Sequence, residues 1–425
     1  MEATPRKTRT MSRVTVALAT GLATGLLAGL PLAQKAQKVP KWRIDPYTKN
    51  DPKKMKRAGY VRYAPIEFGE HASKPVNSAA IDLALGNPKI LWVESAHFLI
   101  GSALPSFAIK TSDRVLSHKL REELARLKKK LPKVNPKTRK LDPWLRIHLF
   151  TQRCEELYED FSKRLGVTDQ SFPTQRNAQL KSGKHRYWGE GPYLGQHGKY
   201  CVLILKRASD YSRYLSLFVG KVQDDPQRWN FKTLGCQLIA TSQETVADGS
   251  HDTRMHCHIV FNVAHNLING YRFYSYDLPV WFMEGMAHWF SRNVSQKYGL
   301  DFDQNESASA KMIHDGKWRP RVLKWMSKLR PAAELLALRD FGQLTKYDHV
   351  KSWSIIDFLM DEYGDEKWRD YMNEIKGYID PNSLQAVAKE VLNLQRKGLR
   401  SAYRLNALTL DEKWKDWVMK EYSGK

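Results

Sequence analysis

Apolar residues repeat at helical spacing in two stretches of the first half of the chain. Val115–Leu131 has this spacing and ends in a basic run, Lys128–Lys130. A longer stretch follows Asp142, which can cap a helix that runs to about Leu165. Its apolar stripe consists of Ile147, Phe150, Cys154, Leu157 and Phe161. We therefore expect two helices here, the second long enough to support a core.

Short, compact apolar runs predict strands around these helices. The runs are Ile90–Val93, His97–Ile100, Tyr200–Leu205 and Leu234–Thr241. The tyrosine-rich stretch Ala208–Val219 lies between the last two and has helical spacing. Residues 89–249 are therefore predicted to form an α+β subdomain.

From Ser250 onward the pattern is mainly helical. Beyond residue 292 it predicts helices near Ser307–Leu329, Ser352–Tyr363, Glu366–Lys376, Ser383–Leu392 and Asp411–Tyr422. We expect residues 250–425 to form a helical subdomain, so that the fold class is α+β with a mainly helical C-terminal part.

The N-terminus has the pattern of an export segment. Basic residues precede an uncharged run, Val14–Gln34, which is typical of a signal peptide within residues 1–34. An uncleaved membrane anchor is the alternative interpretation. Residues 35–88 are rich in lysine and proline, and we expect them to form a basic linker. The protein is therefore predicted to be exported to the periplasm, the cell envelope or the extracellular space.

The net charge of +24 changes the expected partners. It favours attraction to an anionic cell-envelope polymer or a membrane surface, although a basic protein with solvated lysines gives the same number. No motif for nucleic-acid recognition is present, so we expect no specific nucleic-acid partner.

The four cysteines are too scattered for a thiolate metal site. None of Cys154, Cys201, Cys236 and Cys257 belongs to a Cys-x-x-Cys pair. Cys201 and Cys236 could bridge neighbouring strands, and free buried thiols are an equally good interpretation.

The candidate chemistry lies in Met255–Arg292. A histidine-rich helix is expected to end near Gly270, and a second is expected to start at Pro279. His265 on the first and Glu284 on the second stand 19 positions apart in the sequence.

The segment Leu278–Ala287 reads LPVWFMEGMA and resembles the L-P-x-W-x-x-E-G-x-A segment of the gluzincin, or peptidase-MA-like, zinc metallopeptidases. The wider order of elements, from about Lys89 to Tyr422, resembles exported bacterial peptidase-MA-like proteins of unknown function. In that family an H-E-x-x-H helix supplies two zinc ligands and the general base, and a Glu on the next helix is the third ligand. The resemblance implies a gluzincin-like fold in which His265 and Glu284 are the retained ligands.

The first half of the family motif is altered. Its pentad reads Phe261-Asn262-Val-Ala-His265, so that Phe261 stands in the place of the first His and Asn262 in the place of the general-base Glu. A phenyl ring cannot bind zinc, and an amide does not accept a proton near neutral pH. The sequence therefore predicts that ordinary gluzincin hydrolysis is lost.

Two nearby residues, His288 and Tyr347, could restore part of a zinc site or of its catalytic machinery. His288 lies one helical turn after Glu284, so that His265, Glu284 and His288 could form a rearranged zinc site. A paired, metal-free His288 is the alternative. Tyr347 precedes an apolar helix in a context where related enzymes place a Tyr that stabilises the oxyanion, although simple packing at a helix start fits equally.

Three functions remain open from the sequence. The first is an exported, non-catalytic protein of gluzincin fold that binds a peptide, protein segment or polymer in a cleft. The second is an active zinc metallopeptidase with rearranged ligands, and the third is a basic surface protein that binds an anionic envelope polymer. Zinc is the cofactor at issue, and no other is expected.

Overall fold

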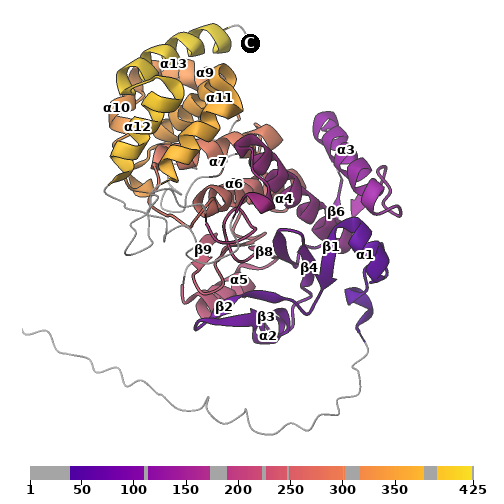
Figure 1. Cartoon of the computed structure of the whole chain (residues 1–425). Coiled ribbons are helices and arrows are strands. Elements are labelled where there is room, and N and C mark those ends of the chain that lie inside the picture. Colours follow the sequence, from indigo (N-terminus) through magenta and orange to yellow (C-terminus); the bar gives the residue numbers. More distant parts are fainter. Residues whose placement is uncertain are drawn as a thin grey trace, which may run out of the picture. The chain divides into compact units, whose positions relative to one another are not determined.

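The computed structural model in Figure 1 describes residues 39–109, 113–172, 189–222, 226–246, 248–299, 301, 316–377 and 390–423. Residues Trp42–Lys425 form one compact unit, and Met1–Lys41 are assigned to a second unit. The predicted signal peptide or anchor, residues 1–34, lies outside the described residues. Among the described residues, no helix has both the length and the apolar character that crossing a membrane requires.

A six-stranded mixed sheet lies at the centre of the N-terminal half. Its strands, in spatial order, are β1 (Tyr60–Tyr63), β4 (Leu91–Ser95), β5 (Phe98–Ser102), β8 (Tyr200–Leu205), β10 (Cys236–Ser242) and β9 (Gln227–Phe231). The pairs β5–β8 and β8–β10 are parallel, and the other neighbours are antiparallel. The four strands predicted from the sequence are confirmed within about two residues at their ends, as expected for such boundaries.

The sheet is buried on both faces, which explains why its central strands are apolar throughout. On β8, Val202 and Ile204 face one core, and Cys201 and Leu203 face the other. The first face packs against α4 (Pro143–Leu165) and α6 (Asp252–Gly270). The second is covered by the hairpin β2 (Glu67–His71) and β3 (Lys74–Asn77), by α2 (Ser78–Ala84), and by α5 (Ala208–Tyr214) with the π-helical turn Leu215–Val219 that continues it.

The long helix α4 forms as its sequence predicts. The side chain of Asp142 accepts hydrogen bonds from the backbone N–H groups of Trp144 and Leu145 at 3.0 and 3.1 Å. At the other end Gly166 has a φ of 63°, a left-handed conformation that glycine adopts without strain. These two caps fix the helix boundaries. The helix α3 (Arg114–Lys130) also matches its prediction.

The segment Trp42–Pro88, which we expected to be a linker, is folded instead. It contains α1 (Pro52–Ala58), β1, the β2–β3 hairpin and α2. Its core contacts come from a few scattered residues, including Met55, Tyr60 and Phe68. Lysine and proline dominate the composition between these residues and conceal the apolar positions, so composition alone misled the prediction.

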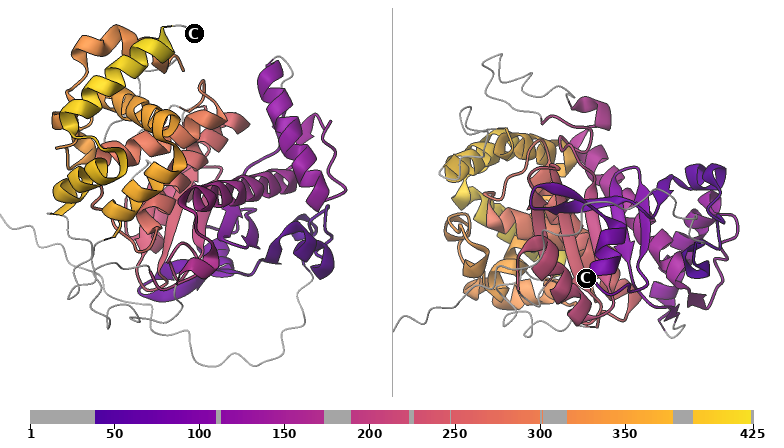
Figure 2. Two further views of the ribbon diagram at one scale, coloured as in Figure 1. Left: turned by 45° about the horizontal axis from the view of Figure 1, so that its top comes forward. Right: turned by 90° about the horizontal axis from the view of Figure 1, so that it is seen from below.

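The C-terminal part is mainly helical (Figure 2). Its helices are α7 (Val280–Val294), α9 (Trp318–Trp325), α10 (Ala332–Leu335), α11 (Lys346–Ile375), α12 (Val391–Tyr403) and α13 (Ala407–Tyr422). The two helices predicted on either side of Gly364 are confirmed: α11 consists of two helical segments joined by a kink at that glycine, which has a φ of 69° and a ψ of −173°.

Two further helix predictions fall partly outside the described residues. The first part of Ser307–Leu329 lies in residues 302–315, and most of Ser383–Leu392 lies in residues 378–389. The described part of the latter differs from the prediction, because α12 does not end at Leu392 but continues to Tyr403.

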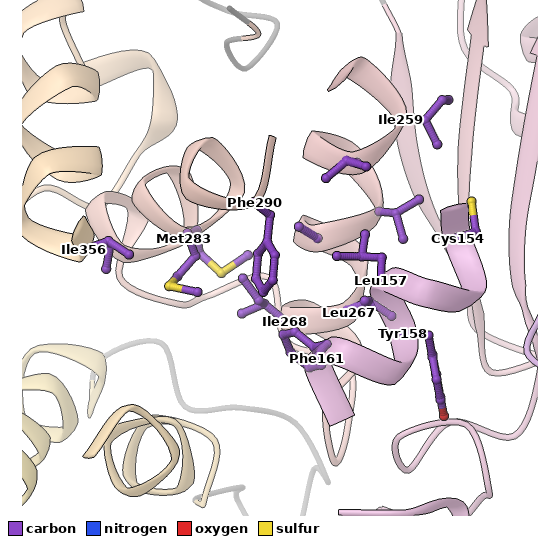
Figure 3. Packing of buried hydrophobic residues seen from close by; sticks show 14 of the residues in the cluster. Cys154, Leu157, Tyr158, Phe161, Ile259, Leu267, Ile268, Met283, Phe290 and Ile356 are labelled. Carbon is purple, nitrogen blue, oxygen red and sulfur yellow. The ribbon is translucent and has the colours of Figure 1, made fainter. Parts of the chain in front are cut away.

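Helix α6 lies in the interior of the molecule. All of its residues from Arg254 to Gly270 are buried. Figure 3 shows how Leu157 and Phe161 of α4 pack toward α6, with Phe290 of α7 beside them. The rings of Phe161 and Phe290 lie 6.2 Å apart. This packing holds α6 and α7 firmly side by side.

The four cysteines are buried and free in the structure. Cys201 on β8 and Cys236 on β10 lie near each other, with 4.0 Å between their sulfur atoms. Burial raises the pKa of the Cys257 thiol to about 12, so this side chain behaves as a small apolar group.

Candidate metal centre

A close contact between α7 and α11 assembles the candidate site. Glu284 lies in the second turn of α7 and is followed by Gly285. A Cβ atom at Gly285 would lie 2.7 Å from the Cγ1 of Ile356 and 2.7 Å from the backbone oxygen of Ser352 on α11. Only glycine therefore permits this approach, which brings His349 of α11 to the carboxylate of Glu284.

Three side chains converge at this contact. His288 Nε2 lies 3.1 Å from His349 Nδ1 and 3.6 Å from Glu284 Oε2. His349 Nδ1 lies 3.2 Å from the same carboxylate oxygen. All three side chains are completely buried. Three potential ligand atoms thus form a nearly equilateral triangle in the interior.

His265 supports this group from α6. Its Nε2 lies 3.0 Å from Glu284 Oε1, the carboxylate oxygen that faces away from the other two histidines. Side-chain hydrogen bonds from His265 and His349 act on the Glu284 carboxylate. The three imidazoles thus surround the buried carboxylate, with ring nitrogens 3.0 to 3.6 Å from its oxygens.

The electrostatics of Glu284 and His288 follow from burial and proximity. Burial alone would raise the pKa of Glu284, but His265 and His349 outweigh it and hold that pKa well below its usual range. For His288, burial dominates over the attraction of Glu284 and lowers the pKa well below its usual value. An ionised carboxylate beside a neutral imidazole is the protonation state in which both groups bind metal ions.

The group Glu284–His288–His349 could hold a metal ion. Ligand atoms about 2.0–2.1 Å from a tetrahedral zinc ion lie about 3.3–3.4 Å from one another. The three separations of 3.1, 3.2 and 3.6 Å scatter around that value. Carboxylate oxygen and imidazole nitrogen are also ligand types that zinc accepts, so the residues present fit such an ion.

Aromatic side chains enclose the centre. The ring of Phe261 lies 5.0 Å from that of His265 and 5.1 Å from that of His288. Trp318 lies 4.9 Å from His288, centroid to centroid, on another side. Phe261, which the sequence resemblance places at the first ligand position, therefore fills space between two of the histidines and covers the centre with apolar surface.

Asn262, which the sequence resemblance places at the position of the general base, makes structural hydrogen bonds. Its Oδ1 accepts a hydrogen bond from Arg228 of β9 at 2.9 Å. Its Nδ2 donates to the backbone oxygen of His258, one turn earlier on α6, at 2.9 Å. The first bond joins α6 to the edge strand, and the second lies within α6.

His258, another histidine of α6, belongs to a separate network. His258 Nδ1 lies 2.7 Å from Asp301 Oδ1, and its Nε2 lies 3.1 Å from Thr241 Oγ1. Arg254 binds the other oxygen of Asp301 at 2.6 Å. This buried network connects α6 to β10 and to the chain after α7.

Sequence reasoning placed the right region at the site but missed one residue. His265, Glu284 and His288 do lie together, whereas the three atoms that could share an ion come from Glu284, His288 and His349. The role of His265 as a direct ligand stays a prediction. His349 carried no local signal, because only the α7–α11 contact brings it to Glu284.

Tyr347 lies at the start of α11, two positions before His349. Its ring packs edge-on against Trp325, with 4.8 Å between centroids. This contact is the simple packing that the sequence also allowed, and a catalytic role for Tyr347 stays a prediction.

Comparison with known proteins gives no relative for this arrangement. No family model, no curated protein and no solved structure matches the chain.

Proposed function

We propose that this protein is a non-hydrolytic, peptidase-MA-like protein whose Glu284–His288–His349 group binds one structural zinc ion. The observation that carries the proposal is the triangle of ligand atoms, with sides of 3.1, 3.2 and 3.6 Å, in a fully buried position. The sequence pattern around Glu284 supports a metal-site origin for this helix pair.

Burial argues for a structural rather than a catalytic ion. A catalytic zinc ion keeps one coordination position open to water and substrate. Here His265, Glu284, His288 and His349 are all completely buried, and Phe261 and Trp318 pack on them. The general-base position is an amide that is bound to Arg228. Ion binding would join α7 to α11, and hydrolysis would lack both a base and an entry for substrate.

Binding of a peptide or polymer remains part of the proposal, and the structure offers a groove for it. A cavity of about 490 Å³ lies between α3, α4, α6 and α7. Leu120, Leu157, Val260 and Phe290 contribute apolar surface to it, and charged residues of α3 and α4 also line it. A cavity of this size with mixed lining suits a short peptide segment. Export, inferred from the N-terminal sequence, is likewise a proposal.

A hydrolysis assay separates this proposal from an active metallopeptidase with rearranged ligands. The zinc-supplemented full chain would be incubated with reduced casein, an unfolded protein, alongside a Glu284→Gln variant. We expect casein to be retained on the protein uncleaved, with no more cleavage by the wild type than by the variant. Cleavage by the wild type that disappears in Glu284→Gln would establish the metallopeptidase instead.

The groove has its own control in this assay. Leu116 lines the cavity and is half-buried on α3, so Leu116→Arg should weaken casein binding and leave the fold intact. Unchanged casein binding by Leu116→Arg would place any peptide site elsewhere.

A further inference from the structure

Exposed cations accumulate on two neighbouring segments far from the metal centre in the sequence. Residues 128–140 contain seven lysines and arginines and no acidic residue. All seven are exposed. Helix α1 adds four more exposed cations, Lys53, Lys54, Lys56 and Arg57.

The two segments form one surface, because they are anchored to the same core. Met55 of α1 and Val134 and Leu141 of the second segment belong to one buried cluster. The hydroxyl of Tyr47, shortly before α1, hydrogen-bonds to Asp142, which follows the second segment directly, at 2.5 Å. Figures 1 and 2 both show α1 beside the loop that follows α3. We call these eleven exposed cations the basic surface.

The loop that carries most of the basic surface has an ordered backbone. The loop is held by backbone hydrogen bonds from Val134 to Leu131 and from Thr138 to Asn135. Within the part of the chain that the structure describes, no ion pair involves the cations of residues 128–140. Because the backbone of the loop is already ordered, binding of an external anion need not pay the entropy of ordering that backbone.

We infer that the basic surface binds the headgroups of an anionic phospholipid membrane. The cations project from a helix and a loop instead of lining the groove between α3 and α7, as contact with a plane of headgroups requires. In the sequence, only residues 35–41 separate this unit from the uncharged run Val14–Gln34, which the sequence pattern assigns to export or anchoring. Polybasic segments beside such a run bind anionic leaflets. The inference is independent of the metal centre and of hydrolysis.

Vesicle cosedimentation of the full chain tests this inference. Vesicles of phosphatidylcholine alone would be compared with vesicles that contain about one third phosphatidylglycerol. If the uncharged run Val14–Gln34 inserts into membranes, it adds to the binding of both kinds of vesicle and does not affect the comparison. We expect binding to the anionic vesicles to be at least tenfold tighter and to weaken steeply with salt, since several lysines each contribute near the charged surface.

A pair of variants with equal charge separates the basic surface from net charge. In the first, Lys128, Lys129, Lys130, Lys133 and Lys137 are changed to Gln. In the second, five exposed lysines elsewhere are changed to Gln: Lys163, Lys232, Lys324, Lys328 and Lys413. The first variant should lose about tenfold or more of its affinity for anionic vesicles and the second little, with both folded by circular dichroism.

Three outcomes would overturn the inference. Equal losses in the two variants would mean that net charge alone attracts the membrane. Equal affinity for the neutral and the anionic vesicles would show that binding does not depend on the charge of the membrane. Binding to a soluble polyanion such as polyphosphate, without binding to anionic vesicles, would assign the basic surface to a polymer instead.

Discussion

His349 and His265 contact opposite oxygens of the Glu284 carboxylate, and this division gives each residue a separate task. His349 lies 3.2 Å from Oε2, the oxygen that also faces His288, and His265 lies 3.0 Å from Oε1. In metal sites, groups that hold a ligand in place tune affinity without binding the ion themselves. In this account His265 positions Glu284, whereas His349 completes the ligand set.

The two tasks predict different losses of metal affinity. His265→Gln should weaken zinc binding by about 10–100-fold while the protein still reaches full occupancy at high zinc. Competition with a chromophoric chelator measures this affinity. A complete loss of zinc binding in His265→Gln would instead make His265 a direct ligand, and an unchanged affinity would remove it from the site.

A second residue-scale prediction concerns Arg292 in the last turn of α7. Its guanidinium lies over Trp318 and Trp353, which pack edge to face, at 4.1 and 4.7 Å from the ring centroids, and donates to the backbone oxygen of Gly316 at 2.8 Å. Burial lowers its pKa to about 9. Lysine lacks the planar group that can contact both rings. Arg292→Lys should lower the free energy of unfolding by roughly 1–3 kcal/mol.

Urea unfolding measures the Arg292 effect, and Arg396→Lys is its matched control. Arg396 is exposed on α12, so its replacement should change stability by less than about 0.5 kcal/mol. If both variants lose the same free energy of unfolding, the contacts of Arg292 with the two tryptophans do not stabilise the fold.

At the scale of elements, the contact between α7 and α11 depends on Gly285. Gly285→Ala would place a Cβ atom 2.7 Å from both Ile356 and the backbone of Ser352, and the backbone cannot yield cheaply. We expect a loss of about 1–3 kcal/mol in the free energy of unfolding and weaker metal binding, because the helices must separate. Thermal and urea unfolding with and without zinc measure both effects.

Gly342→Ala is the control for the helix contact. A Cβ atom at Gly342 would meet only Asp340 Oδ1, at 3.4 Å, and the residue has an ordinary backbone conformation. Its replacement should be nearly neutral. If Gly285→Ala is also neutral, α7 and α11 do not pack as closely as described.

The hairpin between β4 and β5 predicts a pH-dependent contribution to stability. His97 lies between two carboxylates, with Nδ1 2.5 Å from Glu155 and Nε2 3.1 Å from Asp169, and it stacks on Tyr158. Burial alone would lower the pKa of His97, but Glu155 and Asp169 outweigh it and raise this pKa above its usual value. The charged form therefore stabilises the fold fully below about pH 6.5, and this contribution disappears as the pH rises through the raised pKa.

The change His97→Gln should therefore cost more stability near pH 6 than near pH 9. Urea unfolding across this range measures the difference. His118→Gln provides the control, because His118 is exposed and contacts only Glu122 at 3.6 Å among the ion pairs described. A loss in His97→Gln that does not change with pH would show that His97 acts through packing instead of charge.

Prediction from the sequence succeeded where local signals were complete. Asp142 marks the start of α4, the helical pattern ends near Leu165, and Tyr200–Leu205 is an uninterrupted apolar run, so these elements were found with their boundaries. The folded structure of Trp42–Pro88 was not predicted, because its buried residues are sparse and do not repeat at helical or strand spacing over a long stretch. His349 was missed because a single histidine on an apolar helix gains meaning only from the helix packed against it.

Within the molecule as a whole, the proposed metal centre lies where separate parts of the chain converge. His265 comes from α6, which packs on the sheet through β10, Glu284 and His288 come from α7, and His349 comes from α11 of the C-terminal helices. A bound ion would therefore connect the layers of the fold directly. The expected consequence is global stabilisation by zinc, which grows with the logarithm of its free concentration above the dissociation constant.

Elemental analysis of the purified, dialysed full chain shows directly whether the Glu284–His288–His349 group holds a metal ion. The wild type and the Tyr347→Phe variant should each retain about one zinc ion per chain, and His349→Ala should retain no more than background. Tyr347 lies on the same turn of α11 as His349 and controls for disturbance of that helix. Wild-type protein without a transition metal, or an equal metal content in His349→Ala, would contradict the metal centre described.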